Sequence, residues 1–412
     1  MPTSFVNMEL HDWRQFSSVG IDFHKQATIL TGANGSGKTT ILALLAKHFS
    51  WPRTFYGLSF RRSDGRFAFF LPHSDEGSWH EIGSLTYDDG QRADLRMPQD
   101  APAGVTASYD VAIKGQQRLA GIYLVSHRSV ANYTKIDTIP ASFGEPEQLY
   151  TQLLQELRRR HEGQRSQKSP FTWMKESIIA AAVFGEGSKS VEPNEIAREV
   201  WWEYQHVLER ILPDSLGFRR LVVRAPEVIV ETRSGAFPMD ESSGGMSALM
   251  ELGWQILLKS MGQDAFVVLF DEPENHLHPE LQRQIVPNLL EAFPHIQFII
   301  STHSPFVVTS VADSNVYVLD YGADGMVYSR LLDQANKAAG AEETLERVLG
   351  LKSTMPAWAE RAFARVLERH LHGPVSSEKL LALRTDLDAL GLAATFPAAV
   401  ADAIRDEAQD VE

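Results

Sequence analysis

Apolar residues along the first part of the chain alternate with polar ones or gather in short runs, a pattern typical of β-strands. The pattern predicts strands at 5–10, 17–23, 27–30 and 119–125. After the third of these, apolar residues recur at helical spacing from Ile41 to Phe49. Residues 52–120 are rich in Gly, Asp, Ser and Pro with alternating apolar positions, which indicates a β-rich lobe with long turns.

The middle of the chain changes to helical periodicity. Helices are predicted at 145–160, 172–183 and 194–212. The heptad pattern is too weak and too short for a long coiled coil. We therefore interpret residues 131–215 as a helical insertion.

Short apolar runs and helical segments alternate in the second half. The pattern predicts two strands within 219–232 and a helix at 247–260. Further strands are predicted at 266–270, 298–301 and 316–320, and helices at 279–293 and 305–312. Alternation of this kind favours a mostly parallel sheet covered by helices, an α/β fold. After residue 330 the pattern is helical. The predicted segments are 1–130 and 216–330 as two lobes of one nucleotide-binding head, 131–215 as the insertion, and 331–412 as a helical C-terminal subdomain.

Composition narrows the class of protein. Apolar residues make up 43% of the chain and there is no cysteine, so a buried core is expected and disulfides and thiolate metal sites are excluded. The first ten residues lack a secretory signal and no apolar run is long enough to span a bilayer, so we expect a cytoplasmic protein with no membrane partner. With a net charge of −14, any contact with nucleic acid must come from a local patch.

A glycine-rich segment between a predicted strand and a predicted helix matches the pattern G-x-x-x-x-G-K-[ST]. Glycines allow consecutive backbone N–H groups to point at phosphate oxygens, and the helix N-terminus adds partial positive charge. Lys38 would reach the β- and γ-phosphates of ATP, and Thr39 would ligate Mg²⁺. The predicted nucleotide-binding residues are Gly32, Asn34, Gly35, Ser36, Gly37, Lys38, Thr39 and Thr40.

Two carboxylates follow the apolar run Val267–Phe270. A buried parallel strand places both at its carboxyl end, where open α/β sheets bind ligands. Asp271 would hold Mg²⁺ and Glu272 would orient or polarise the attacking water, because phosphoryl transfer needs positioning and charge neutralisation. The alternative is a strand that ends in a solvated turn. His303 follows the next apolar strand and could contact the γ-phosphate, although a lone histidine is more often structural.

The order of these motifs resembles that of the ABC-type ATPases. The likeness rests on Gly32–Thr39, Ser242-Ser243-Gly244-Gly245, the phrase from Asp271 to Pro279, and Ser301-Thr302-His303-Ser304-Pro305. The phrase Asp-Glu-Pro-Glu-Asn-His-Leu-His-Pro is most similar to the RecF/SMC-like soluble branch, and within it to the overcoming-lysogenization-defect-like ATPases of phage-defence systems. The segment Ser126-His127-Arg128 after a strand also looks like that branch.

The resemblance implies a head-to-tail homodimer, or a higher oligomer, with ATP between two heads. Ser242, Ser243 and Gly244 would contact the γ-phosphate held by the opposite protomer, residues 274–279 would link the two sites, and His303 would be the switch histidine. The signature departs from Leu-Ser-Gly-Gly-Gln, since Glu241 precedes it and Met246 follows. ABC-type ATPases also have a glutamine at a set position between their lobes, and here the candidates for that position are Gln116, Gln117 or the 126–128 turn. The adenine could stack on Trp13 or Phe16, unless these are core residues.

Relatives of this type often carry a C-terminal Toprim nuclease, which this sequence does not indicate. Asp386-Leu387-Asp388 and His370-Leu371-His372 both fall in helical stretches, so we interpret them as helix faces. The apolar tail residues favour an ordinary packed subdomain over a docking face for a partner; they are Trp358, Phe363, Val366, Leu367 and Leu371.

Basic residues cluster at Arg158–Arg160, with Arg165 and Lys168 nearby, and more weakly at Arg61, Arg62 and Arg66. The first cluster is either a solvated helix end or an arm that contacts phosphates or an acidic partner.

The sequence thus predicts a Mg²⁺-dependent ATP-hydrolysing switch that acts with a separate nuclease or toxin effector in antiphage defence, with nucleic acid as a further partner class. Three alternatives remain open. They are a RecF-like repair ATPase that loads other proteins onto DNA, a nucleotide-gated scaffold with little turnover, and the ATPase subunit of a transporter.

Overall fold

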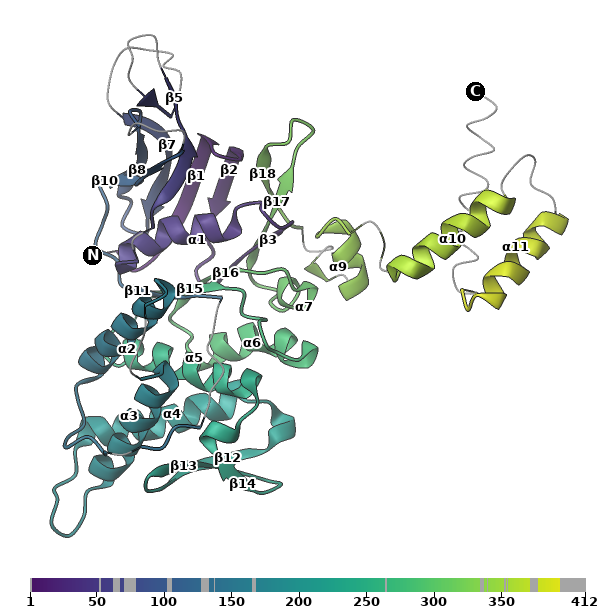
Figure 1. The fold of residues 1–412 in the computed structure, drawn as a ribbon. Coiled ribbons are helices and arrows are strands. Elements are labelled where there is room, and N and C mark those ends of the chain that lie inside the picture. Colours follow the sequence, from purple (N-terminus) through teal and green to yellow (C-terminus); the bar gives the residue numbers. More distant parts are fainter. Residues whose placement is uncertain are drawn as a thin grey trace. The chain divides into compact units, whose positions relative to one another are not determined.

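A computed structural model of the chain (Figure 1) describes residues 2–51, 53–61, 67–69, 79–101, 106–126, 133–136, 138–164, 168–263, 265–333, 337–338, 340–351, 353, 355–370 and 377–392. The chain divides into two compact units, Met1–Thr344 and Leu345–Glu412. The first unit contains the segments predicted at 1–130, 131–215 and 216–330, which the sequence distinguishes by pattern and which pack together in one unit.

Eleven strands of the first unit form one sheet, in the order β10-β8-β7-β1-β2-β18-β17-β3-β16-β15-β11. Their bounds are β1 (Phe5–Trp13), β2 (Phe16–Asp22), β3 (Ala27–Gly32), β7 (Trp79–Tyr87), β8 (Arg92–Pro98), β10 (Ala112–Lys114), β11 (Gly121–Leu124), β15 (Val267–Asp271), β16 (Gln297–Ser301), β17 (Asn315–Tyr321) and β18 (Val327–Leu331). The neighbours from β17 to β11 are parallel, and those from β10 to β2 are antiparallel.

The strand β18 joins these two groups, because it pairs antiparallel with β17 and parallel with β2. The predicted parallel sheet and antiparallel lobe are therefore parts of a single mixed sheet. The α/β fold class is confirmed. Strand β18, which joins the parallel and antiparallel parts of the sheet, lies at the end of the segment predicted as the second lobe.

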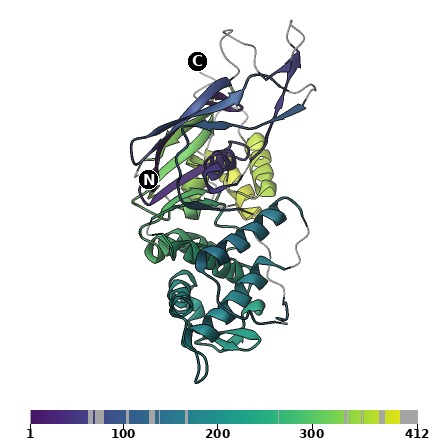
Figure 2. The same cartoon turned by 90° about the vertical axis from the view of Figure 1, so that its left-hand side faces the viewer.

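Helix α1 (Lys38–Ala46) leaves β3 through the glycine-rich segment and packs against β3, β15 and β16 (Figure 2). Seven of its nine residues are buried, so the helix is apolar on nearly all sides. Its core extends into the antiparallel part of the sheet and includes Trp13 and Phe16, which are both 0% exposed. The two aromatic residues considered for adenine stacking are therefore core residues.

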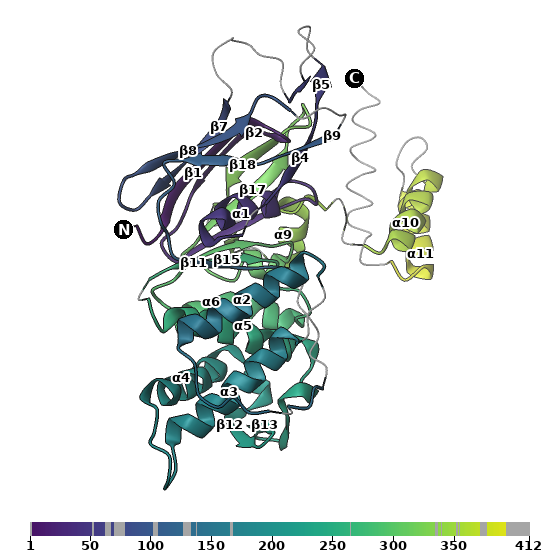
Figure 3. The same cartoon turned by 60° about the vertical axis from the view of Figure 1, so that its left-hand side comes forward.

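The predicted helical insertion consists of α2 (Pro146–His161), α3 (Pro170–Glu186) and α4 (Glu195–Ile211). These pack with α5 (Gly244–Ser260) and α6 (Pro279–Ala292) on one side of β11 and β15, as Figures 1 and 3 both show. Asn194 begins α4 by accepting a hydrogen bond from the Ala197 N–H, and the apolar residues of α4 recur every three or four positions and are buried. The periodicity of the sequence therefore located these helices to within a few residues.

A small antiparallel sheet follows α4 and leads into α5. It contains β12 (Phe218–Arg224), β13 (Glu227–Thr232) and β14 (Ala236–Pro238). A 3₁₀ turn, η3 (Met239–Glu241), follows β14 directly, and Ser242 and Ser243 then lead into α5. The remaining short elements of this unit are η1 (Lys47–Phe49), β4 (Phe55–Leu58), β5 (Phe60–Arg61), β6 (Phe67–Ala68), β9 (Thr106–Tyr109), η2 (Asp214–Leu216) and α7 (Pro305–Val308).

Helix α9 (Ala341–Arg347) crosses the boundary between the units, and the second unit contains α10 (Ala357–His370) and α11 (Ser377–Ala389). Val366 is buried between these two helices, and Phe363 and Leu367 pack against the same cluster, whereas Trp358 is 59% exposed. Leu371 lies outside the described residues. The D-x-D sequence lies on helix α11, as predicted, and Asp386 accepts a hydrogen bond from Arg369 and is bonded to His370, contacts that were not predicted. No helix among the described residues is long and apolar enough to cross a membrane.

Candidate functional site

The glycine-rich segment is shaped by two close contacts. Gly37 has a φ of 99°, and a Cβ at this position would lie 2.3 Å from the ring of Phe16. Gly32 has a φ of 135°, and a Cβ there would lie 2.4 Å from the carbonyl oxygen of Leu319. Only glycine fits both positions, so the loop can turn sharply from the end of β3 into the N-terminus of α1.

Lys38 is buried at the start of α1. Its Nζ donates to the carbonyl oxygens of Gly32 (3.0 Å) and Ala33 (3.1 Å), so the ammonium lies inside the curve of the loop. Burial lowers the pKa of Lys38 to about 8, against the opposing effect of the nearby carboxylates of Glu272, Asp271 and Glu274. The lysine therefore lies where a phosphate group bound in the loop would meet it.

Asp271 ends β15, directly beside Ser301 at the end of β16. Its carboxylate accepts hydrogen bonds from Thr39 Oγ1 (3.2 Å), from Ser301 Oγ and from the Tyr123 hydroxyl (3.3 Å). Burial raises the pKa of Asp271, and these hydrogen bonds oppose the rise. The predicted pair of magnesium ligands, Thr39 and Asp271, is thus brought together from the first and second halves of the sequence.

Glu272 has a φ of 50°, a conformation that turns its side chain away from the course of β15. Its Oε1 lies 3.8 Å from His303 Nε2, and its Oε2 accepts a hydrogen bond from Asn275 Nδ2 at 2.8 Å. Burial and the ammonium of Lys38 lower the pKa of His303, against the opposing effect of Glu272 and Asp271, and so favour the neutral imidazole. The two predicted catalytic residues therefore face each other at the same edge of the sheet as Lys38.

Glu274 was predicted only as part of the linking loop, residues 274–279. The structure shows that its Oε1 accepts hydrogen bonds from Thr302 Oγ1 (2.7 Å), the His303 N–H (2.7 Å) and the Ser304 N–H (3.2 Å). The carboxylate therefore fixes the turn that carries His303. No local pattern indicated this role, because the partners lie about thirty residues away in sequence.

The signature segment, Ser242–Gly245, lies at the N-terminus of α5. Ser243 caps this helix by accepting from the Met246 N–H at 3.4 Å, and Ser242 Oγ is buried with no hydrogen-bond partner among the described residues. A Cβ on Gly245 would lie 2.8 Å from the His276 carbonyl oxygen, so the start of α5 packs closely on the linking loop. The linking loop thus contacts both the signature segment and the turn of His303.

Of the candidates for the glutamine expected between the lobes, Gln116, Gln117 and the 126–128 turn, the structure describes the two glutamines and Ser126, and of these described residues Ser126 contacts the linking loop. Asn275 Nδ2 donates to the Ser126 carbonyl oxygen at 3.3 Å, and His127 and Arg128 lie outside the described residues. Gln117 instead bonds to Gly115 and Tyr87, in the turn after β10. Its neighbour Gln116 is in the same turn, where its N–H donates to the Ile113 carbonyl oxygen.

Two arginines that the sequence did not single out lie beside the glycine-rich loop. Arg14 and Arg53 line a hollow of about 450 Å³ together with Thr39, Thr40 and Tyr56. The guanidinium of Arg14 lies 5.8 Å from the centre of the Phe55 ring, within cation–π range. The sequence did not predict this hollow, because neither arginine belongs to a motif or to a cluster of basic residues.

The basic cluster at Arg158–Arg160 is only partly a solvated helix end. Arg158 lies over the Trp51 ring at 5.6 Å and donates to the Phe49 carbonyl oxygen, so it holds α2 against η1. Arg159 lies 3.8 Å from Glu156. Lys168 is likewise paired with Glu176. These contacts within the protein occupy part of the charge that a phosphate-contacting arm, the second of the two alternatives, would use. Arg62, Arg66 and Arg165 lie outside the described residues.

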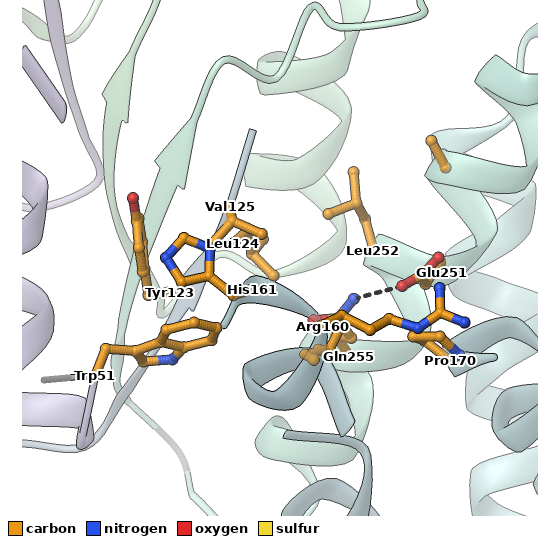
Figure 4. A pocket seen from close by; sticks show the side chains of 12 residues that line it. Trp51, Tyr123, Leu124, Val125, Arg160, His161, Pro170, Glu251, Leu252 and Gln255 are labelled. Carbon is orange, nitrogen blue, oxygen red and sulfur yellow. Dashed lines mark hydrogen bonds between the residues drawn. The ribbon is translucent and has the colours of Figure 1, made fainter. Parts of the chain in front are cut away.

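Arg160 lines a separate cavity of about 230 Å³ at the junction of β11, α2 and α5. Figure 4 shows the side chains of Trp51, Tyr123 and His161 on one side of this cavity and those of Glu251 and Gln255 on the other. The Tyr123 ring lines the cavity while its hydroxyl bonds to Asp271. The cavity thus adjoins the carboxylate at the end of β15.

Comparisons with known proteins match two parts of the chain to ATPase families. Residues 204–309 match a family described as "AAA domain, putative AbiEii toxin, Type IV TA system", and residues 7–47 match a family described as "AAA domain". These ranges contain the glycine-rich loop, the signature segment, Asp271, Glu272 and His303.

Similar proteins include a retron Vc95 probable ATPase from Vibrio cholerae serotype O1 biovar El Tor, 48% identical over 54 residues, which are 13% of this chain and 10% of that protein. The Septu protein PtuA of Bacillus thuringiensis is 28% identical over 158 residues, 35% of this chain and 40% of PtuA. The matched regions thus span less than half the length of these relatives.

Among solved structures, the SMC head domain from Thermotoga maritima aligns with a TM-score of 0.43 at 12% identity, over 80% of this chain and 99% of that one. The matched ranges, which hold the converging motifs, are thus similar to AAA ATPase domains, to the retron Vc95 probable ATPase and to the Septu protein PtuA.

Proposed function

We propose that this chain binds ATP with Mg²⁺ at the glycine-rich loop and hydrolyses it. One observation carries the proposal. Lys38, the Thr39–Asp271 pair and the Glu272–His303 pair meet at the carboxyl edge of the parallel strands, although they come from three separate parts of the sequence. Phosphoryl transfer requires this combination of a phosphate cradle, a metal ligand set and a group that positions water.

The residues present fit a magnesium ion. Thr39 Oγ1 and the Asp271 carboxylate are hard oxygen donors only 3.2 Å apart. Among the described residues there is no cluster of three or more His, Cys, Asp or Glu side chains suited to a metal. A site with few protein ligands suits Mg²⁺, which keeps several waters and binds phosphate oxygens. When bound, the ion would neutralise charge on the β- and γ-phosphates.

Glu272 is placed to act on the attacking water. Its Oε2 accepts a hydrogen bond from Asn275, and its Oε1 lies on the His303 side, where the carboxylate would accept the proton of a water that attacks the γ-phosphorus. The bond from the γ-phosphorus to the β–γ bridging oxygen then breaks, and ADP and phosphate leave. His303 would donate its Nε2–H to a γ-phosphate oxygen.

We infer further that a second copy of the chain completes the site with its signature segment. Ser242, Ser243 and Gly244 stand at the N-terminus of the 17-residue helix α5, and a helix N-terminus offers unpaired N–H groups and partial positive charge to an anion. ATP hydrolysis would then open a dimer that ATP binding closes.

The test is ATP turnover and ATP-dependent dimerisation by the purified chain, with Lys38→Ala and Glu272→Gln. We expect both variants to lose turnover, and Glu272→Gln to keep ATP and remain dimeric. Glu209→Gln is the matched control, since Glu209 is exposed on α4, and it should behave as wild type. Wild-type protein that binds ATP without turnover would instead support the nucleotide-gated scaffold.

We propose antiphage defence with a separate effector as the cellular role, on the strength of the relatives from retron and Septu systems. Phage plaque counts should rise in cells that carry the native locus with Lys38→Ala. Unchanged plaque counts with new sensitivity to DNA damage would favour the RecF-like alternative.

A further inference from the structure

A fully buried lysine of the helical insertion is joined to the turn that precedes the signature segment. Lys175, on α3, has a side chain that is 0% exposed. Its Nζ donates to Asp240 Oδ2 at 2.5 Å and to Glu227 Oε2 at 2.6 Å. Asp240 belongs to η3, and its own side chain is only 1% exposed.

The other groups around Lys175 complete this cluster. The Lys175 ammonium lies 5.4 Å from the centre of the Tyr133 ring, and the Tyr133 hydroxyl donates to Glu227 Oε1 at 3.1 Å. The Thr134 carbonyl oxygen is 3.4 Å from Nζ. One ammonium thus faces two carboxylates, and these come from the start of β13 and from η3.

The position of Asp240 gives the cluster a consequence for the signature segment. The residue after η3 is Ser242, whose N–H donates to the Met239 carbonyl oxygen, and Ser243 then caps α5. A shift of η3 would therefore move Ser242 and the first turn of α5. The linking loop also packs on this turn, since a Cβ on Gly245 would lie 2.8 Å from the His276 carbonyl oxygen.

The free-energy cost of burying the charges of Lys175 and Asp240 indicates that this cluster serves to fix the backbone rather than to add stability. Burying a lysine and an aspartate costs several kcal/mol per ion by general estimates, and a well-packed apolar pair of similar volume is often as stable. A buried ion pair therefore adds little stability by itself, but it can select one arrangement of the backbone over others. Here the backbone that it fixes belongs to the turn before Ser242.

We propose that Lys175 is a positioning residue for the signature segment, through which the helical insertion controls ATP-dependent pairing of two heads. This inference rests on the proposed function, in which the signature segment of one copy meets ATP held by another. A movement of α3, driven by whatever binds the insertion, would release η3 and uncouple the signature segment without touching the glycine-rich loop.

The test uses Lys175→Met in the full-length chain. We expect unchanged ATP binding by the single chain, and turnover and ATP-dependent dimerisation reduced about tenfold or more, in line with the cost of small misplacements. Lys175→Arg should restore most activity, because it keeps the charge. Lys168→Met is the matched control on the same insertion, since Lys168 is half-exposed and pairs away from η3.

Removal of Lys175 strands two carboxylates and could unfold the chain. Asp240→Asn is the second variant, because Lys175 then keeps Glu227 as a partner. It should show the same loss of dimerisation with a melting temperature near that of the wild type. Wild-type dimerisation by a folded Asp240→Asn or Lys175→Met protein would overturn the proposal.

Mixing experiments separate this inference from the proposed function. Gly244→Asp serves as a signature variant, since a Cβ there meets nothing within 4 Å and the added charge would repel phosphate. Equal mixtures of Lys38→Ala and Gly244→Asp should recover about a quarter of wild-type turnover, because half the dimers are mixed and each has one complete site. No recovery in this mixture would contradict the paired-head mechanism itself.

If that mixture recovers, Lys175→Met is mixed with each of the two variants. As a signature-side defect, it should recover with Lys38→Ala, which supplies an intact signature segment, and should fail with Gly244→Asp. The reverse result, recovery with Gly244→Asp only, would place the defect at the nucleotide loop and overturn the role of Lys175.

Discussion

At the scale of single residues, Lys38 makes nucleotide affinity depend on pH. Burial lowers its pKa to about 8, so the ammonium that attracts phosphate is charged below that pH and is lost above it. Binding of a non-hydrolysable ATP analogue with Mg²⁺ should therefore weaken about tenfold between about pH 7 and about pH 9. Calorimetry in buffers of different ionisation heat should show uptake of close to one proton per site at the higher pH.

A second variant tests the cause of this behaviour. The Glu272 carboxylate raises the pKa of Lys38, so Glu272→Gln should move the midpoint of the affinity curve to lower pH. Glu209→Gln, which changes an exposed residue on another helix, should leave the midpoint in place. An affinity that is constant across this pH range would mean that Lys38 stays charged throughout it, and would contradict the lowered pKa.

At the scale of elements, the linking loop fixes the position of residues 302–304, the turn after β16. Glu274→Ala removes the acceptor of three hydrogen bonds from residues 302–304, so His303 loses its support. Turnover should fall by about 10- to 100-fold, as expected for a misplaced catalytic group, while ATP affinity stays within about threefold. Glu274→Gln keeps the accepting Oε1 and should retain most of the turnover. Equal losses in both variants would show that the charge, rather than the hydrogen bonding, matters.

The same elements show what the sequence could predict. The glycine-rich loop, the run before Asp271 and the helices between 145 and 212 were predictable, because each rests on a motif or a period within one segment. The bond from Lys175 to Asp240 and the bonds from Glu274 to residues 302–304 were not, since they join residues 65 and about thirty positions apart. The sequence placed Arg158 in a basic cluster, because its stacking partner, Trp51, lies far from it in the sequence.

At the scale of the whole molecule, the division into two compact units predicts two responses to nucleotide. Every residue of the proposed ATP site lies within Met1–Thr344, and the pair α10 and α11 has its own apolar cluster in Leu345–Glu412. Ligand at about 100 times its dissociation constant stabilises a protein by about 2.7 kcal/mol, which for a unit of this size is a rise in Tm of about 4 °C.

Differential scanning calorimetry with Mg²⁺-ADP should accordingly show one transition that moves and a smaller one that does not. Lys38→Ala should remove the shift while both transitions remain, because the variant lacks the phosphate ligand and keeps both cores. A single transition that moves as a whole would mean that the second unit unfolds together with the ATPase unit. In that case the helical tail would sense the nucleotide, and its exposed Trp358 would become a reporter of the state of the site.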